Sequence, residues 1–258
     1  MKKKYLIHYV LGCLSLLFLS NAELFAQFKQ DQLRYRRVEE ARYEKDYGLE
    51  KEFEVRGLHF PPEEVYIRVF KKEGVLELWV KDYGDRFVKL KDYTICASAG
   101  KLGPKRRQGD MQVPEGYYHI TKFNPQSQYF LSLGVSYPNR VDRAAGYASR
   151  LGGNIYIHGE CKTAGCVPIN NNKIKEVYWL CVLAKNSGQK RIPVHIYPFK
   201  FNNPRHYATE MSKHSLHRNL IDFWDNIRIG YDYFELNKSI PNVTCLLYTS
   251  DAADEWLR

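Results

Sequence analysis

Residues 155–169 read I-Y-I-H-G-E-C-K-T-A-G-C-V-P-I, and this segment is the strongest indication of the fold and the chemistry in the sequence. A short apolar run, typical of a strand, ends at His158 and Gly159. One loop later Gly165 and Cys166 precede a second apolar stretch. A cysteine attacks acyl groups as its thiolate, so a working nucleophile needs a base or a positive environment nearby. A histidine at a strand end and a cysteine at the end of the next loop can supply that pair.

The neighbours of the pair indicate how it would work. Gly165 permits a tight turn, so that N–H groups near Cys166 can point at a developing oxyanion. His158 would take the thiol proton as a general base and later return a proton to a leaving amine. This role requires a neutral imidazole whose second ring nitrogen is held by an acceptor, which the sequence does not identify.

Other interpretations of the window stay open on spacing alone. A buried structural cysteine is the commoner fate of an isolated cysteine, and a histidine at a strand end is often simply hydrogen-bonded. His158, Cys161 and Cys166 could ligate zinc with a further histidine, although the spacing matches no common zinc module. A Cys161–Cys166 disulfide is also possible, and it would silence the nucleophile until it was reduced.

Length and composition indicate a globular protein, and the N-terminal segment indicates export. The chain has 258 residues, of which 44% are hydrophobic and 14% aromatic, so it can bury one sizeable core. Three lysines at positions 2–4 and an apolar run to Leu19 predict a signal peptide over residues 1–26, with a retained membrane anchor as the alternative. We therefore expect a protein of the periplasm or cell envelope, without a stable membrane span after signal removal.

The charge and the end of the chain each support one further expectation. A formal net charge of +10 favours binding to anionic surfaces such as the cell wall, and we find no nucleic-acid-binding motif.

Residues 245–258 begin C-L-L-Y-T-S-D-A-A-D-E, which looks like translated sequencing adapter. If so, Cys245 is not native and the native C-terminus is missing, which resequencing across the junction would test.

The periodicity of the remaining chain predicts a β-rich domain flanked by helices. Strands are predicted at 65–70, 75–80, 87–96, 117–122, 129–137, 154–158 and 192–197. One helix is predicted over 28–55, one over 173–185 after the cap 170–172, and one or two over 204–238. The loop 99–115 is too long for a mere connection, so it is expected to be functional or mobile. Cys96 and Cys181 lie in apolar runs, where a small buried hydrophobe is the default reading.

Taken together, these motifs resemble the catalytic domain of the YkuD-type L,D-transpeptidases, and its YafK-like subgroup in particular. The resemblance rests on the His-Gly and Gly-Cys pairs, on residues 102–105 and 109–118, and on 130–133 and 137–143. It spans about residues 62–240, and it implies a mainly β, sandwich- or barrel-like domain with a helix after the nucleophile strand. The chain then divides into a signal peptide (1–26), an N-terminal helical segment (27–60), the catalytic domain (61–198), a helical C-terminal extension (199–244) and the suspected adapter (245–258).

The resemblance implies an enzyme of cell-wall biogenesis and cell shape that acts on diaminopimelate-containing stem peptides of peptidoglycan through a thioester. The family often has Ser or Thr two residues before the glycine of its Gly-Cys pair, as here. The implied site residues are Cys166 and His158 for catalysis, Gly165, Gly159 and Thr163 around the oxyanion, and Lys105, Asp142 and Arg143 for substrate carboxylates and amines. Each of the last three, taken singly, could be solvated surface charge. No metal or other cofactor is implied.

One position departs from the family pattern. Pro168 stands two residues after the cysteine, where typical members carry a polar residue, often arginine. The YafK-like subgroup lacks that residue too, and some of its members resemble hydrolases that release wall-linked protein. The acyl acceptor is therefore open between an amine and water, which makes an amidase or L,D-carboxypeptidase the alternative. A non-catalytic metal- or wall-binding module is the third possibility.

Overall fold

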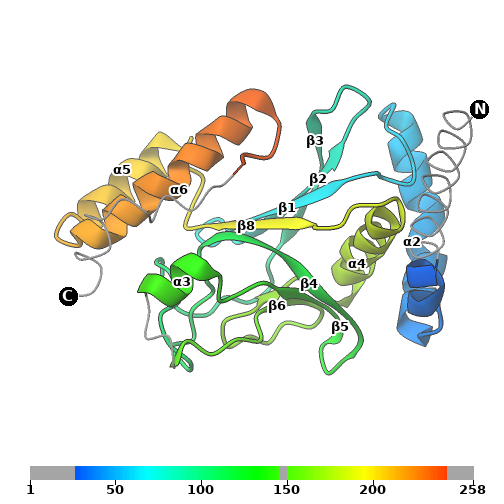
Figure 1. The fold of residues 1–258 in the computed structure, drawn as a ribbon, viewed down its shortest axis with the longest axis horizontal. Helices are drawn as coiled ribbons and strands as arrows, with labels where there is room; N and C mark the ends of the chain where they lie inside the picture. Colours follow the sequence, from blue (N-terminus) through cyan, green and yellow to red (C-terminus); the bar gives the residue numbers. More distant parts are fainter. Residues whose placement is uncertain (1–26, 146–149, 243–258) are drawn as a thin grey trace, which may run out of the picture.

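A computed structural model describes residues 27–145 and 150–242 (Figure 1). The predicted signal peptide (1–26) and the suspected adapter-derived tail (245–258) lie outside the described residues. Within the described part of the chain, no helix is both long enough and apolar enough to cross a membrane.

Among the described residues, eight strands form one mixed sheet in the order β3-β2-β1-β8-β4-β5-β6-β7. The strands are β1 (Val65–Phe70), β2 (Val75–Lys81), β3 (Phe87–Thr94), β4 (Gly116–Ser127), β5 (Phe130–Val135), β6 (Tyr156–His158), β7 (Val167–Pro168) and β8 (Pro193–Tyr197). The β1–β8 and β6–β7 pairs are parallel, and the other neighbours are antiparallel. Every predicted strand is confirmed. The two-residue β7 is the Pro-containing strand expected after Cys166, although two residues are too few to show a periodicity.

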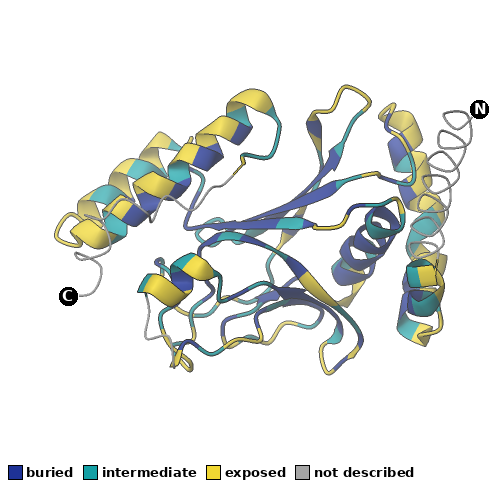
Figure 2. Ribbon diagram, viewed as in Figure 1, coloured by how far each residue is buried: buried dark blue, intermediate teal, exposed yellow. Residues whose placement is uncertain are grey.

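Both faces of the central strands are covered by helices (Figures 1 and 2). In β1 the side chains at 65, 67 and 69 join the core that contains α4 (Asn171–Asn186). Those of Tyr66 and Phe70 point to the opposite face, where they join clusters with residues of α6 (Arg218–Asn237). Successive side chains of a strand alternate between faces, so β1 is buried along its whole length.

The helices begin and end near the predicted positions. The single helix predicted over 28–55 is interrupted at residues 34–35, so that residues 27–33 form one helical segment and α2 (Arg36–Val55) the next. The helix α2 lies on the outer side of α4. The Asn170 side chain caps α4 by accepting a hydrogen bond from the Lys173 N–H at 3.1 Å. The region 204–238 forms two helices, α5 (Pro204–Lys213) and α6, and a short α3 (Arg140–Ala145) follows β5. The expected fold class is confirmed, including the helix after the nucleophile strand and the helical C-terminal addition.

Candidate active site

The two shortest strands place the cysteine and the histidine on one face of the sheet. β6 ends at His158, and the parallel register pairs His158 with Pro168 of β7. Continuing that register backwards places Cys166 beside Tyr156. Side chains two residues apart on a strand share a face, so Cys166 and His158 project to the same side. Both border a cavity of about 430 Å³, which we call the histidine-side cavity.

The Cys166 thiol is partly buried above the start of β6. Its Sγ accepts a hydrogen bond from the Tyr156 N–H at 3.4 Å and donates to the Asn154 carbonyl oxygen at 3.5 Å. Burial raises the pKa of this thiol above its ordinary value of 9.0, and the Tyr156 N–H and the positive charge of Lys105 oppose that rise. The thiol is therefore protonated near neutral pH, and it needs a base to become a nucleophile.

His158 is held in the tautomer that this role requires. Its Nδ1 lies 2.5 Å from the Gly159 carbonyl oxygen, which can only accept, so Nδ1 carries the proton and Nε2 is left as the base. The imidazole is 1% exposed and stacks on the Tyr129 ring, with 4.6 Å between centroids. Burial lowers the pKa of His158 below 6.5, and the hydrogen bond to the Gly159 carbonyl and the negative charge of Glu160 oppose this shift. The imidazole is consequently neutral at neutral pH.

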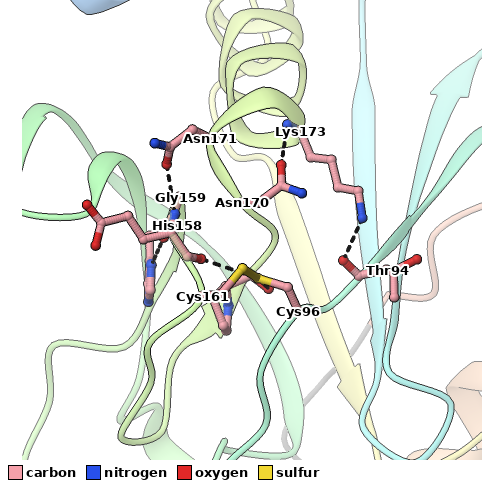
Figure 3. Close-up of a disulfide and its surroundings, with 10 residues drawn as sticks. Thr94, Cys96, His158, Gly159, Cys161, Asn170, Asn171 and Lys173 are labelled. Atoms are coloured by element: carbon pink, nitrogen blue, oxygen red, sulfur yellow. Dashed lines mark hydrogen bonds between the residues drawn. A yellow bond between two sulfur atoms is a disulfide. The ribbon is translucent and has the colours of Figure 1, made fainter.

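Gly159 is the acceptor that the sequence did not identify, and no larger residue fits there. A Cβ on Gly159 would lie 2.5 Å from the Asn171 Oδ1 and 2.8 Å from the Tyr129 carbonyl oxygen. The same Asn171 Oδ1 accepts a hydrogen bond from the Glu160 N–H at 2.8 Å (Figure 3). Gly159 therefore contacts the histidine through its carbonyl group, and the start of α4 packs against it.

The predicted oxyanion donors are occupied in this structure. The Thr163 Oγ1 accepts hydrogen bonds from the N–H groups of Gly165 at 3.1 Å and Cys166 at 2.8 Å. The same hydroxyl donates to the Cys166 carbonyl oxygen at 2.8 Å. Thr163 thus fixes the turn that carries Cys166. An oxyanion would have to take one of these N–H groups from Thr163.

The three predicted substrate contacts lie in different surroundings. Lys105 borders the histidine-side cavity and pairs with Asp110 at 2.5 Å. Asp142 is buried and accepts a hydrogen bond from the Tyr118 hydroxyl at 3.1 Å. Arg143 donates to the Pro138 carbonyl oxygen. The side chains that border the histidine-side cavity include Lys105, but neither Asp142 nor Arg143.

A second cavity, of about 590 Å³, also reaches Cys166, and we call it the α5-side cavity. Its border includes residues 71–74 and 95–102, together with Glu210 and Lys213 of α5. The sequence did not indicate that the C-terminal extension lies beside the cavity that reaches Cys166. The amphipathic pattern of a helix indicates which face is buried, but it does not indicate which cavity that face borders.

A disulfide overturns two of the predictions made for the cysteines. Cys96 is bonded to Cys161, with their Cα atoms 5.4 Å apart, so its reading as a small buried hydrophobe is wrong (Figure 3). The Cys161–Cys166 disulfide is wrong as well, because the thiol of Cys166 is free. Cys181 is free and buried, as predicted. A zinc set that includes Cys161 is no longer available, and within residues 27–145 and 150–242 no group of three or more His, Cys, Asp or Glu could hold a metal.

Two neighbours of His158 and Cys166 were not found from the sequence. Tyr129, which stacks on His158, follows β4 at a tight turn, and Asn154 precedes β6 with a positive φ of 58°. Neither belongs to a motif, and a lone tyrosine or asparagine carries no sequence signal for a site. Only the fold brings them to His158 and Cys166.

Comparison with known proteins identifies the family. The L,D-transpeptidase catalytic domain (YkuD) matches residues 64–196. The chain is also 38% identical over 182 residues to "Putative L,D-transpeptidase YafK" of Escherichia coli K12, a match that covers 70% of each protein. This chain belongs to the L,D-transpeptidase catalytic domain family. The protein of the same name in Escherichia coli O157:H7 matches equally well. The resemblance inferred from the motifs is thereby confirmed.

Solved structures of two other proteins resemble this L,D-transpeptidase family member more distantly. The helical cell shape determining protein Pgp2 from Campylobacter jejuni has a TM-score of 0.42 and 23% identity, over 53% of this chain and 48% of that one. Bd1075 from Bdellovibrio bacteriovorus has a TM-score of 0.38 and 22% identity, over 54% of this chain and 48% of that one. The match therefore spans about half the length of either protein.

Proposed function

We propose that this chain is an exported L,D-transpeptidase that acts on diaminopimelate-containing stem peptides through a thioester on Cys166. The observation that carries the proposal is the shared cavity of Cys166 and His158. The cysteine is free, and the histidine is fixed with Nε2 as its basic nitrogen. Membership of a family that acts on peptidoglycan supports the substrate class.

The first half-reaction follows from these protonation states. The Nε2 of His158 takes the thiol proton while the Cys166 Sγ bonds to the carbonyl carbon of the donor peptide. The negative charge then moves to the carbonyl oxygen, where an N–H group released by Thr163 could hold it. The carbon–nitrogen bond breaks, His158 returns its proton to the leaving amine, and a thioester remains.

The second half-reaction regenerates the enzyme. His158 takes a proton from the attacking amine, whose nitrogen bonds to the thioester carbon, and the carbon–sulfur bond breaks. The proton then returns to the Cys166 sulfur. Water in place of the amine would give the hydrolase alternative through the same steps, with a carboxylic acid as the product.

The lining of the histidine-side cavity suits a peptide that carries carboxylates. Lys105 and Lys162 border it, beside amide and hydroxyl side chains such as Gln108 and Ser132. Among the described residues that line it there is no Asp or Glu. A carboxylate of a stem peptide would meet hydrogen-bond donors and the positive charge of Lys162 there, whereas the charge of Lys105 is already paired with Asp110.

The test is incubation with purified muropeptides followed by mass spectrometry. Cys166→Ala is expected to abolish product formation, whereas Cys181→Ala, which changes the other free cysteine of the described residues, is the matched control and should retain it. A cross-linked product supports transpeptidation, and a shortened or released product supports the hydrolase. The absence of product from wild-type protein with its Cys96–Cys161 disulfide intact would overturn the enzyme proposal.

Export is tested separately from catalysis. We expect cell fractionation to place the protein in the envelope fraction, with its N-terminus cleaved near residue 26. Recovery of the uncleaved chain in the cytoplasm would contradict export and leave the chemistry of Cys166 untouched.

A further inference from the structure

The loop 99–115 stands between the two cavities that meet at Cys166. Residues 99–102 border the α5-side cavity, whereas Lys105 and Gln108 border the histidine-side cavity. The loop also touches the nucleophile turn, because a Cβ on Gly165 would lie 2.8 Å from the Gln112 carbonyl oxygen. The position of this loop therefore sets the shape of both cavities.

A buried ion pair closes the base of the loop. The Lys71 Nζ donates to the carbonyl oxygens of Gly103 and Val113, each at 2.9 Å, and pairs with Glu115 at 2.8 Å. The Glu115 Oε1 also accepts the Gly103 N–H at 2.7 Å. The side chain of Lys71 is 8% exposed and that of Glu115 is 0% exposed. Together they hold both ends of the loop at one point.

The C-terminal extension packs on the loop through Phe223, over which Arg106 lies at 5.9 Å, and it reaches Glu115 through Trp224. The Trp224 Nε1, on α6, donates to the Glu115 Oε2 at 2.8 Å. Trp224 is fully buried and lies edge-on to Phe199 and His214, so its indole has little freedom to move. Without this N–H, the Glu115 carboxylate would keep its pairing with Lys71 through Oε1, but the buried Oε2 would lose its donor, and a buried polar atom without a hydrogen-bond partner is costly.

We propose that Trp224, acting through Glu115, positions the loop 99–115 and hence the walls on both sides of Cys166. Trp224 and Glu115 are positioning residues, and the C-terminal extension is part of the active-site architecture. The kinetic consequence rests on the proposed function of Cys166, whereas the structural consequence for the loop does not.

The chain offers a matched pair of tryptophan variants. Trp224→Phe removes the N–H bond to Glu115 and keeps an aromatic ring. Trp79→Phe removes a comparable buried bond, from the Trp79 Nε1 to the Glu77 Oε2 at 3.0 Å. Trp79 also packs on α6, through Phe234 at 4.9 Å. The two variants thus disturb the contact between α6 and the sheet similarly, but only the first reaches the loop.

Loop position is read by native-state proteolysis with trypsin, for which the exposed Arg107 is a cleavage site within the loop. We expect Trp224→Phe to be cut there several-fold faster than wild type, because local opening governs cleavage. We expect Trp79→Phe to be cut at the wild-type rate. With muropeptides, Trp224→Phe should lose about tenfold in kcat/KM, mostly through KM, because misplaced walls weaken substrate positioning.

Equal proteolysis and equal kinetics in Trp224→Phe, Trp79→Phe and wild type would overturn the positioning role. If Trp224→Phe does not fold, Glu115→Gln keeps the side-chain volume and tests the same link by the same two measurements. If the wild type has no activity, the proposed function fails, and the proteolysis comparison still decides whether Trp224 positions the loop.

Discussion

Cys161, which lies in the chain between His158 and Cys166, is joined by a disulfide to Cys96 (Figure 3). Cys96 follows β3, and its N–H donates to the Pro168 carbonyl oxygen at 3.0 Å. The loop between His158 and Cys166 is therefore held at its ends by β6 and β7 and in between by a covalent bond.

Removal of this disulfide is expected to destabilise the protein. In Cys96→Ser/Cys161→Ser the 65-residue span between the two cysteines is no longer closed in the unfolded chain. The chain-entropy argument gives an upper value of about 4 kcal/mol for the loss in free energy of unfolding. Urea unfolding measures it. A reductant should lower the stability of the wild type and leave that of the double variant unchanged; an equal response of both would contradict the role of this bond.

The pH dependence of Cys166 reactivity should report His158. Burial lowers the pKa of the imidazole below 6.5, so the base stays neutral and active until the pH falls below that value. Burial raises the pKa of the thiol above 9.0, so a His158→Gln variant should react only at alkaline pH. Alkylation by iodoacetamide, followed by mass spectrometry from about pH 5 to about pH 10, should show both profiles.

Turnover in His158→Gln should fall by a factor of ~10²–10⁴, as expected when a general base is removed. The buried Cys181 serves as an internal control for alkylation, because it becomes accessible only when the protein unfolds. A variant whose alkylation profile coincides with that of the wild type would show that His158 does not act on the thiol.

Replacement of Gly165 should cost more than backbone strain alone. Its φ is +123°, and a Cβ would lie 2.8 Å from the Gln112 carbonyl oxygen. Gly188 has a similar φ of +110° with nothing within 4 Å, so Gly188→Ala isolates the strain, about 1–3 kcal/mol. Urea unfolding should show a larger loss for Gly165→Ala, and slower alkylation of Cys166 should accompany it. Equal losses of unfolding free energy for the two variants would mean that the turn at Gly165 does not pack closely against the loop 99–115.

Stability should fall in acid because of His195. Burial, aided by the charge of Arg68, lowers the pKa of His195 to about 3, whereas the unfolded side chain takes up a proton near 6.5. This contribution is complete above pH 6.5 and is lost as the pH falls towards 3, at about 1.4 kcal/mol per pH unit. His158 acts in the same direction, and Asp142, whose pKa burial raises, acts in the opposite one.

The comparison is between wild type and His195→Gln at pH 7 and pH 5. The loss of unfolding free energy over this interval should be about 2 kcal/mol larger in the wild type, because only the wild type has this group to titrate. Urea unfolding at the two pH values gives both differences. The same loss in both proteins would assign the acid sensitivity to other groups.

Local patterns in the sequence were sufficient for most of the elements. The apolar runs at 65–70 and 75–80, separated by a turn-like segment, predicted β1 and β2, and Asn170 marked the start of α4. Each of these signals lies within a few residues of the structure that it specifies, because strand propensity, turns and helix caps act over short distances. The His-Gly and Gly-Cys pairs were likewise legible, since the turn glycine and the nucleophile are neighbours in the chain.

The sequence by itself determined the strands, the helix cap and the residues that carry the proposed chemistry. Only the tertiary structure decided that Cys96 bonds Cys161, that the Gly159 carbonyl fixes the His158 tautomer, and that Trp224 reaches Glu115. The disulfide and the Trp224 bond join segments far apart in the chain, and the His158 bond depends on how the ring packs. No pattern of residue types ranks one such partner above another until the sheet order has brought the segments together.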